Sequence, residues 1–296
     1  MFTLAHLSDV HLAPLPRPRI GELVNKRITG YINWLRGRRF VHDRAVLERL
    51  VDDLKEQAPD HIAITGDIAN IALEEEFVRG RRWLQQLDSF KNVSFVPGNH
   101  DAYVRQAVRY APQWAPYMTG DDGAVGFPYV RRRGPVALIG LSTAVATAPF
   151  MATGRLGPNQ LAALTALLNR TRAEGLFRVI LIHHPPVSEA KPHKRLTDAA
   201  GFLSVIAAHG AELVLHGHDH LHMLNWLDGP GGTRVPAVGV PSASAAPGTA
   251  HDAAAYNLYR IGGAPGAWTC TMTSRGIAAG GAISQRDEVP LIAVGR

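Results

Sequence analysis

Five short polar motifs, each following a run of apolar residues, constrain this chain more than any other feature. They are Asp9-Val-His11, Gly66-Asp67, Gly98-Asn99-His100-Asp101, His183-His184-Pro185-Pro186 and Gly217-His218-Asp219-His220. The apolar runs are typical of buried strands, and helical spacing between several of them predicts strands that alternate with helices. Such a chain folds around a largely parallel sheet, with polar side chains gathered beyond the carboxyl ends of the strands.

The predicted elements follow this alternation through the first three quarters of the chain. Strands are expected at 4–7, 62–65, 93–96, 136–141, 179–182 and 213–215. Helices are expected at 42–57, 73–88, 158–172 and 197–209. From about residue 225 the pattern changes to strands separated by Gly and Pro, at 224–227, 235–240, 256–261 and 268–272. These later strands predict antiparallel or mixed pairing.

Composition predicts a single domain spanning 1–296. The chain is 46% hydrophobic, which is enough for one sizeable core, and no linker divides it. Within this domain we expect a basic insertion at about 14–41 and a β-rich part from about 225. Cys270 is the single cysteine, so an intrachain disulfide is excluded and a reducing compartment is favoured.

The cellular location is expected to be cytoplasmic. The N-terminal residues run directly into the first motif and lack the charged and apolar regions of a signal peptide. No apolar stretch is long enough to span a bilayer. A peripheral position on the inner face of the membrane is the alternative.

The spacing within two motifs suits metal ligands. Asp9 and His11 stand at i and i+2, as do His218 and His220, and residues at this spacing point the same way in an extended chain. Mixed carboxylate, amide and imidazole ligands suit two adjacent first-row ions, so we expect two divalent or trivalent metals among Mn, Fe, Zn and Co. Two such metals beside open coordination positions predict hydrolysis of a phosphoester.

The motifs, in this order, resemble those of the calcineurin-like metallophosphoesterase superfamily over about residues 3–222. The His-His-Pro-Pro form of the fourth motif resembles the bacterial branch that includes class III cyclic-nucleotide phosphodiesterases and glycerophosphodiesterases. The resemblance implies an α/β fold, specifically a four-layer α/β/β/α sandwich. It also implies a phosphodiesterase that hydrolyses a P–O bond by attack of a metal-bridging hydroxide.

The resemblance also implies a role for each motif residue. One metal would be held by Asp9, His11 and His220, the other by Asn99, His183 and His218, and Asp67 would bridge them. His100 would contact the phosphoryl group or protonate the leaving oxygen, with Asp101 orienting its ring, and Asn99 would also face the substrate.

Three further histidines have open roles. His184 could lie behind the metal ligands, face the substrate or be structural. His251, in an Ala-rich loop, could reach the substrate. His216 competes with His218 as a ligand, but the glycine before His218 favours His218 and His220.

The insertion at 14–41 is basic and amphipathic. Between residues 17 and 39 it holds seven Lys or Arg residues against one acidic residue, in a chain whose net charge is +6. Its apolar residues at helical spacing are Ile20, Leu23, Val24, Ile28, Tyr31 and Leu35. This pattern favours a helix whose apolar face packs on the body. The alternatives are a cap over the active site and a membrane-surface helix that favours an anionic lipid or a lipid-linked nucleotide.

A second basic cluster, Arg131–Arg133, indicates either an anion-binding patch or a solubilising surface.

The expected partner is a small anionic phosphoester, and the substrate class stays open. Cyclic or glycerol diesters compete with lipid-linked pyrophosphates of the UDP-diacylglucosamine type. Nucleic acid is the least supported, because the chain has no separate nucleic-acid-binding module. A non-catalytic metal-binding scaffold is the alternative of a different class, but the presence of all the ligands and of His100 argues against it. A homo-oligomer, through strands at 226–261, is a further option.

Overall fold

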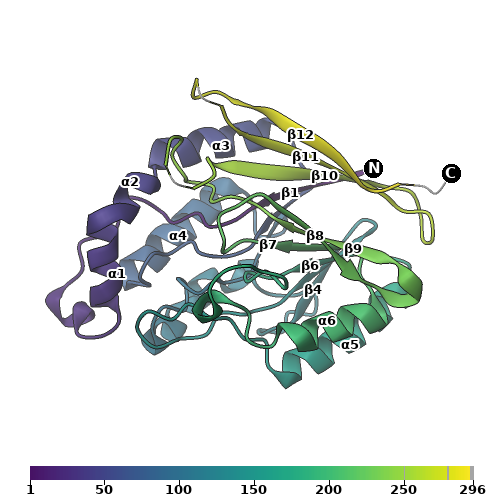
Figure 1. Cartoon of the computed structure of the whole chain (residues 1–296), viewed down its shortest axis with the longest axis horizontal. Helices are drawn as coiled ribbons and strands as arrows, with labels where there is room; N and C mark the ends of the chain where they lie inside the picture. The colour runs from purple at the N-terminus through teal and green to yellow at the C-terminus, as the bar shows by residue number, and fades with distance from the viewer. Residues whose placement is uncertain (250, 279, 294–296) are drawn as a thin grey trace.

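Two six-stranded sheets pack face to face, with helices on both outer faces (Figure 1). The computed structural model describes residues 1–249, 251–278 and 280–293. The strand order is β12-β11-β10-β1-β2-β3 in the first sheet and β4-β5-β6-β7-β9-β8 in the second.

The first sheet joins the N-terminal strands to the C-terminal ones. Its strands are β1 (Phe2–Leu7), β2 (His61–Ile64), β3 (Val93–Phe95), β10 (Ala255–Gly262), β11 (Thr269–Ile277) and β12 (Ile283–Ile292). β1, β2 and β3 are parallel, whereas β10 pairs antiparallel with β1 and starts an antiparallel extension. The predicted change of pairing in the C-terminal part is therefore confirmed.

The second sheet is mostly parallel. Its strands are β4 (Tyr129–Arg133), β5 (Val136–Gly140), β6 (Phe177–Leu181), β7 (Leu213–His216), β8 (Met223–Asp228) and β9 (Arg234–Gly239). β5, β6, β7 and β9 run parallel, and β4 and β8 close the two edges in antiparallel pairing.

Four helices form the outer layers. They are α3 (Arg44–Glu56) and α4 (Glu74–Leu87) on the first sheet, and α5 (Pro158–Ala173) and α6 (Ala199–His209) on the second. In α3, the carboxylate of Asp43 caps the first turn, and Leu47, Leu50 and Leu54 are buried. A separate apolar cluster that includes Leu138 fills the space between the sheets. The expected four-layer α/β/β/α sandwich is confirmed.

Short helical segments complete the described chain. They are Ile20–Leu23, α1 (Arg27–Asn33), Trp34–Arg38, α2 (Arg39–Val41), Arg105–Arg109, Ala111–Tyr117, Pro192–Lys194 and Pro230–Gly232. Among the helices of the described ranges, none is both long enough and apolar enough to cross a membrane.

The cluster Arg131–Arg133 forms most of β4, a strand that was not predicted. The guanidinium of Arg131 is buried and donates to backbone carbonyls of the neighbouring loops. Arg132 pairs with Glu174, and Arg133 pairs with Asp121. All three guanidinium groups have protein partners and join loops to the sheet edge. Of the two roles left open, the structure does not support the anion-binding patch.

The insertion is helical, but the face that packs on the body differs from the predicted one. Arg27, Gly30 and Trp34 are buried, and the Arg27 guanidinium donates to the carbonyls of Ile71 and Ala72. A Cβ on Gly30 would lie 2.6 Å from both Ile71 and Tyr103, so only glycine allows this approach. The apolar residues Ile20, Val24, Ile28 and Leu35, which the prediction placed against the body, are instead exposed.

Candidate active site

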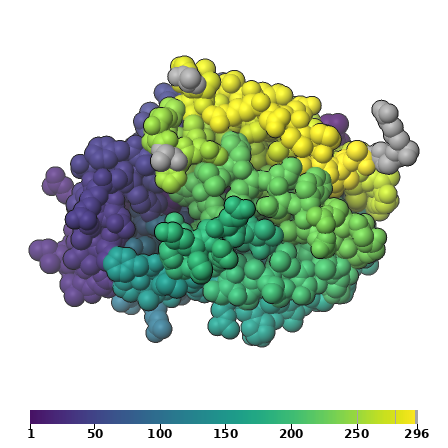
Figure 2. All heavy atoms as spheres, in the orientation of Figure 1, coloured from purple at the N-terminus to yellow at the C-terminus, as the bar shows by residue number. Residues whose placement is uncertain are grey.

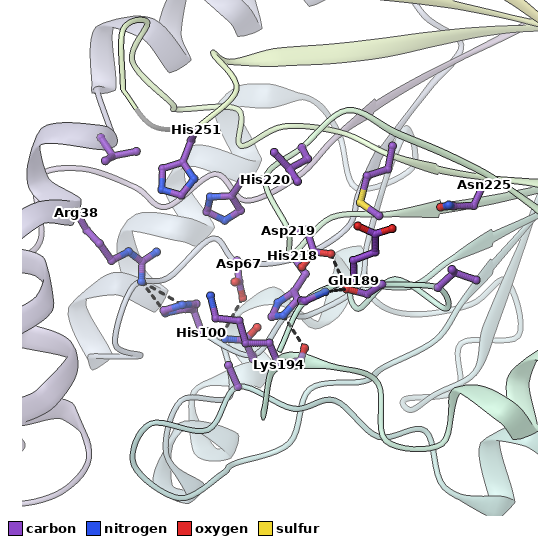
Figure 3. A pocket seen from close by; sticks show the side chains of 18 of the residues that line it. Arg38, Asp67, His100, Glu189, Lys194, His218, Asp219, His220, Asn225 and His251 are labelled. Atoms are coloured by element: carbon purple, nitrogen blue, oxygen red, sulfur yellow. Dashed lines mark hydrogen bonds between the residues drawn. The ribbon is translucent and has the colours of Figure 1, made fainter. Parts of the chain in front are cut away.

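The five motifs meet where strands of both sheets end. The Asp9 amide donates to the Gly66 carbonyl over 3.0 Å, which joins the loops after β1 and β2. The loops after β1 and β7 meet where the His218 amide donates to Asp9 Oδ2 over 3.0 Å. A pocket of about 810 Å³ opens over this junction (Figure 3). Side chains from both sheets therefore share one site.

Five of the predicted metal ligands have left-handed backbone conformations. Their φ angles are 52° at Asp9, 40° at His11, 58° at Asp67, 71° at His218 and 57° at His220. Non-glycine residues rarely adopt this region, and such residues cluster at functional sites where the surrounding structure enforces the conformation. The chain thus accepts backbone strain at the positions that the motifs mark.

One ligand group contains Asp9, His11 and His220, as predicted for the first metal. One ligand atom from each lies within 4.8 Å of the others. The Nε2 of His220 is 3.1 Å from Asp9 Oδ1, and the Nε2 of His11 is 3.9 Å from the same oxygen. The carbonyl of Ala69 is hydrogen-bonded to His11 Nδ1, which leaves Nε2 turned toward the carboxylates.

A second group contains Asp9, Asp67 and His183. The Nε2 of His183 lies 3.4 Å from Asp67 Oδ2 and 3.2 Å from Asn99 Oδ1. Its Nδ1 is held by the Thr65 carbonyl at 2.6 Å. Three of the residues expected around the second metal are therefore together, and Asp67 stands between the two groups because its Oδ2 also lies 3.9 Å from His11.

His218 lies beside the second group without joining it. Its ring centre is 5.2 Å from that of His183, and its Nε2 is 2.8 Å from the Lys194 carbonyl. This contact leaves Nδ1 as the nitrogen for a cation, so the assignment of His218 as a ligand stays a prediction.

His100 lies closer to the ligands than the sequence analysis expected. Together with His11 and Asp67 it forms a third group of possible ligands. Its backbone amide donates to Asp67 Oδ1 over 2.8 Å, and its Nδ1 is hydrogen-bonded to the Asn70 carbonyl. The Nε2 of His100 is therefore the nitrogen that faces the pocket, where Arg38 Nη1 lies 3.0 Å from it.

The prediction that Asp101 orients the ring of His100 is wrong. The Asn70 carbonyl is hydrogen-bonded to that ring instead. The Asp101 carboxylate instead accepts hydrogen bonds from the backbone amides of Asp67, Ala69 and Gly98, at 2.8, 2.9 and 2.9 Å. Burial and the nearby charge of Asp67 raise the pKa of Asp101 to about 7. Asp101 thus joins the second and third motif loops and supports the site from behind.

Charge balance in the site favours cations. Burial alone would raise the pKa of the Asp9 and Asp67 carboxyls, but His220 and His183 reverse this effect and hold both pKa values below their usual range. Burial lowers the pKa of His183, yet Asp67 and Asp9 outweigh it and raise that pKa to about 10. Two ionised carboxylates in a buried site need positive partners, and a metal ion can replace the imidazole proton.

The donor set fits two metal ions. His11 and His183 each give one ring nitrogen to a backbone carbonyl and present the other to a carboxylate, which is how proteins orient imidazole ligands. Carboxylate oxygens, an amide oxygen and imidazole nitrogens together suit Mn, Fe, Co or Zn. The chain is therefore built to carry the two metal ions that the motifs predicted.

Two motif glycines are required because neighbouring side chains pack directly against their backbone. A Cβ on Gly98 would clash with Asp67 Oδ1 and would lie 2.7 Å from the His183 ring. A Cβ on Gly217 would clash with the side chains of Ser8 and Asp9. Any larger residue at these positions would displace the predicted ligands.

Two residues that no motif indicated also belong to the site, one near the end of the insertion and one directly after it. Arg38 places its guanidinium between the rings of His11 and His100, with N–N distances of 3.0 to 3.1 Å. Figure 3 shows its contact with His100. The ring of His42 is centred 4.5 Å from that of His11 and is held by Ser244 Oγ at 2.9 Å. The only signal in the sequence was the basic character of the segment, which cannot single out one arginine.

The three histidines with open roles separate clearly. His184 is buried, and both ring nitrogens are hydrogen-bonded, to Thr143 Oγ1 and the Ala152 carbonyl, so a structural role replaces the suggested substrate contact. His216 is buried and belongs to none of the ligand groups among the described residues. His251 lines the pocket, with its ring centre 5.6 Å from that of His220, and thus can reach a substrate (Figure 3).

Comparison with solved structures supports the fold. A dimetal phosphatase from Danio rerio superposes with a TM-score of 0.65 at 15% identity, covering 98% of each chain. A 5'-nucleotidase precursor from Thermus thermophilus superposes with a TM-score of 0.50 at 16% identity, covering 99% of this chain and 54% of that protein.

Comparison of sequences shows the family. A probable cyclic nucleotide phosphodiesterase from Synechococcus is 28% identical over 172 residues, which is 57% of this chain and 60% of that protein. The match thus spans less than two thirds of the relative's length. The family model described as calcineurin-like phosphoesterase matches residues 2–222, which contain all five motifs. The chain belongs to the calcineurin-like phosphoesterase family.

Proposed function

We propose that this protein is a dinuclear metal-dependent phosphodiesterase. The observation that carries the proposal is the pair of ligand groups that share Asp9. Both groups reach one open pocket, through Asp67 and His220, which line it. A buried site with two anionic carboxylates and several imidazoles has no evident purpose in the packing of the core. It suits cations that act on a phosphoester entering from the pocket.

Asp9, His11 and His220 would hold one cation, and Asn99, His183 and His218 the other, with Asp67 between them. When bound, two cations supply positive charge for the phosphoryl oxygens and lower the pKa of water toward neutrality. The residues of this chain then have to bind, orient and protonate the substrate.

Two further side chains would act on the phosphoryl group itself. The Arg38 guanidinium lies beside His11 and His100, where its N–H groups can bind phosphoryl oxygens. Burial, followed by the charge of Arg38, lowers the pKa of His100 to about 3 in the protein alone. An anionic substrate near Nε2 would offset the charge of Arg38, the smaller of these two causes, and shift this pKa upward. In its protonated form His100 could then donate to the phosphoryl or leaving oxygen.

A diester is favoured over a monoester. The similarity to a probable cyclic nucleotide phosphodiesterase supports this choice, although that match is partial. The pocket volume of about 810 Å³ also leaves room for a group on each side of the phosphate. Lys194 and His251 line the pocket beyond the ligand groups and could contact such groups (Figure 3).

The test compares bis-nitrophenyl phosphate with nitrophenyl phosphate, with manganese added. The proposal predicts faster hydrolysis of the diester, and loss of that activity in Asp67→Asn. Asp52→Asn is the matched control, because Asp52 is an exposed carboxylate on α3. Hydrolysis of the monoester alone would contradict a phosphodiesterase, and equal activity in Asp67→Asn would contradict the site.

A lipid-linked pyrophosphate is the second candidate substrate. One part of the pocket is lined by Val187, Leu221, Met223 and Leu224, and Val187, Leu221 and Leu224 are exposed large apolar residues. Acyl chains could cover this apolar wall while the pyrophosphate lies at the ligand groups. Hydrolysis of detergent-dispersed UDP-diacylglucosamine, with Leu221→Ser raising KM, would support this substrate. Failure to hydrolyse it, in a preparation active on the nitrophenyl diester, would leave the small diesters.

A further inference from the structure

We propose that the outward face of the insertion binds the surface of an anionic lipid membrane. We call it the docking face; its apolar residues are Ile20, Val24, Ile28, Ile32, Leu35 and Phe40. The inference goes beyond the hydrolytic activity, because it concerns where the protein works rather than what it cleaves.

The apolar residues of the docking face are exposed and regularly spaced. Ile28, Ile32 and Leu35 stand at i, i+4 and i+7 through α1 and the helical segment after it, so they share one side of the helix. Ile20 is 88% exposed and Phe40 is 64% exposed, near the two ends of the stretch. An exposed apolar stripe on a short helical segment marks an interaction site.

The opposite face fixes this segment to the body. Arg27 is hydrogen-bonded to the carbonyls of Ile71 and Ala72, and Lys26 Nζ donates to Thr147 Oγ1 over 2.6 Å. Trp34 is buried and stacks on His42, with the two ring planes 5° apart. Because the helix already buries its other side against the body, the exposed apolar stripe is available to a binding partner.

Basic residues surround the apolar stripe. Arg17, Arg19, Arg36 and Arg39 are exposed, and Glu22 is the one acidic residue between Arg17 and Arg39. Arg36 and Arg39 follow Ile32 and Leu35 by four positions, and thus extend the same side of the helix. A basic helix with one apolar side is the pattern of segments that lie in the interface of an anionic membrane.

Charge decides between a membrane and a second copy of this chain. Two copies meeting through the docking face would bring the arginines of one copy against those of the other, and like charges at an interface oppose association. Anionic headgroups would neutralise the same arginines, while the apolar side chains enter the acyl boundary. The anionic lipid surface is therefore the occupant that the composition of this face fits.

Docking would bring the active site to the membrane. Arg38 lies in the same turn as Arg36 and Arg39, but it points inward and lines the pocket together with Val41. In Figure 1 α1 and α2 stand at one edge of the molecule, and Figure 2 shows this purple segment protruding there. A membrane-bound docking face thus lies next to the pocket entrance.

Vesicle co-sedimentation of the full chain tests the inference. We expect binding to vesicles of phosphatidylcholine with phosphatidylglycerol, weakening with added salt, and at least tenfold weaker binding to phosphatidylcholine alone. The double variants Ile28→Ser/Ile32→Ser and Arg36→Gln/Arg39→Gln should each reduce binding at least tenfold. Val125→Ser is the control, because Val125 is 84% exposed and lies outside the insertion.

Three results would overturn the inference: no binding to anionic vesicles, equal binding to neutral vesicles, or unchanged binding in both double variants. A dimer in sedimentation velocity that Ile28→Ser/Ile32→Ser dissociates would assign the docking face to a second copy instead. Hydrolysis of soluble bis-nitrophenyl phosphate should stay at the wild-type rate in these variants. Membrane binding and catalysis are thus measured separately, and failure of one leaves the other standing.

Discussion

The Nη2 of Arg38 lies 3.0 Å from the Nε2 of His11, a predicted metal ligand. This contact places a permanent cation next to a site whose carboxylates and imidazoles suit two metal ions. Like charges so close together repel unless an anion lies between them. The position of Arg38 therefore indicates that the site accommodates an anion, and a phosphoester substrate is an anion of this kind.

Replacing Arg38 should weaken substrate binding. Hydrogen bonds to charged groups contribute about 1.5–3 kcal/mol, so Arg38→Gln should lower kcat/KM for bis-nitrophenyl phosphate by about 10- to 100-fold. Steady-state kinetics at saturating manganese measures this change. Arg36→Gln is the matched control, because Arg36 is exposed two residues earlier on the same helical segment. A wild-type kcat/KM in Arg38→Gln would remove Arg38 from the site.

Replacing His100 should separate catalysis from metal binding. His100→Asn removes the pocket-facing Nε2 while the two ligand groups that contain Asp9 keep their residues, so metal content should stay at the wild-type level. Loss of a group that transfers a proton costs about 10²- to 10⁴-fold in kcat. Metal analysis and kinetics on the same preparation check both parts. A fall in metal content that matches the fall in rate would make His100 a ligand, as its place beside His11 and Asp67 allows.

The fold and much of the site could be predicted because the motifs and the strands coincide. The loops after β1 and β2 deliver Asp9 and Asp67, and side chains at the ends of neighbouring strands must meet. The two clearest failures involve strands with little apolar pattern. β4 contains three consecutive arginines, and β12 is mostly exposed and polar, so neither has the alternation that marks a strand.

The place of Arg38 in the site and the outward position of the insertion's apolar residues could not be predicted, for a physical reason. A helical pattern shows which residues share a face, but not which face meets the body. In the insertion Arg27, Gly30 and Trp34 face inward, and the backbone carbonyls of Ile71 and Ala72 accept hydrogen bonds from the Arg27 guanidinium. Such long-range partners have no local signature in the sequence. The observed role of Asp101 differs from the predicted one for the same reason, because its partners include backbone amides of another loop.

Buried His61 should make stability depend on pH. Burial, followed by the charges of Arg133 and Arg131, lowers the pKa of His61 to about 3 from its ordinary 6.5. The unfolded chain therefore takes up a proton that the folded one refuses, and the stabilisation present above pH 6.5 is lost as the pH falls toward 3.

Between pH 7 and pH 5 this one group lowers the free energy of unfolding by about 2 kcal/mol, because pH 5 lies about 1.5 units below the ordinary pKa of histidine. Urea unfolding measures the free energy of unfolding at the two pH values. Its difference between pH 7 and pH 5 should be smaller by that amount in His61→Gln than in wild type. An identical difference in the two proteins would mean that His61 is protonated in the folded state as well.

Metal titration of the metal-free protein tests the central claim most directly. Manganese is added while bound metal and hydrolysis of bis-nitrophenyl phosphate are followed together, in wild type and in Asp67→Asn. We predict two metal ions per wild-type chain, with activity rising as the second site fills. In Asp67→Asn we predict fewer bound metal ions and a larger loss of activity than removal of a residue that only supports a ligand would cause. Removal of such a residue costs about 10- to 100-fold. Full activity with one metal ion, or without any, would contradict a dinuclear phosphodiesterase.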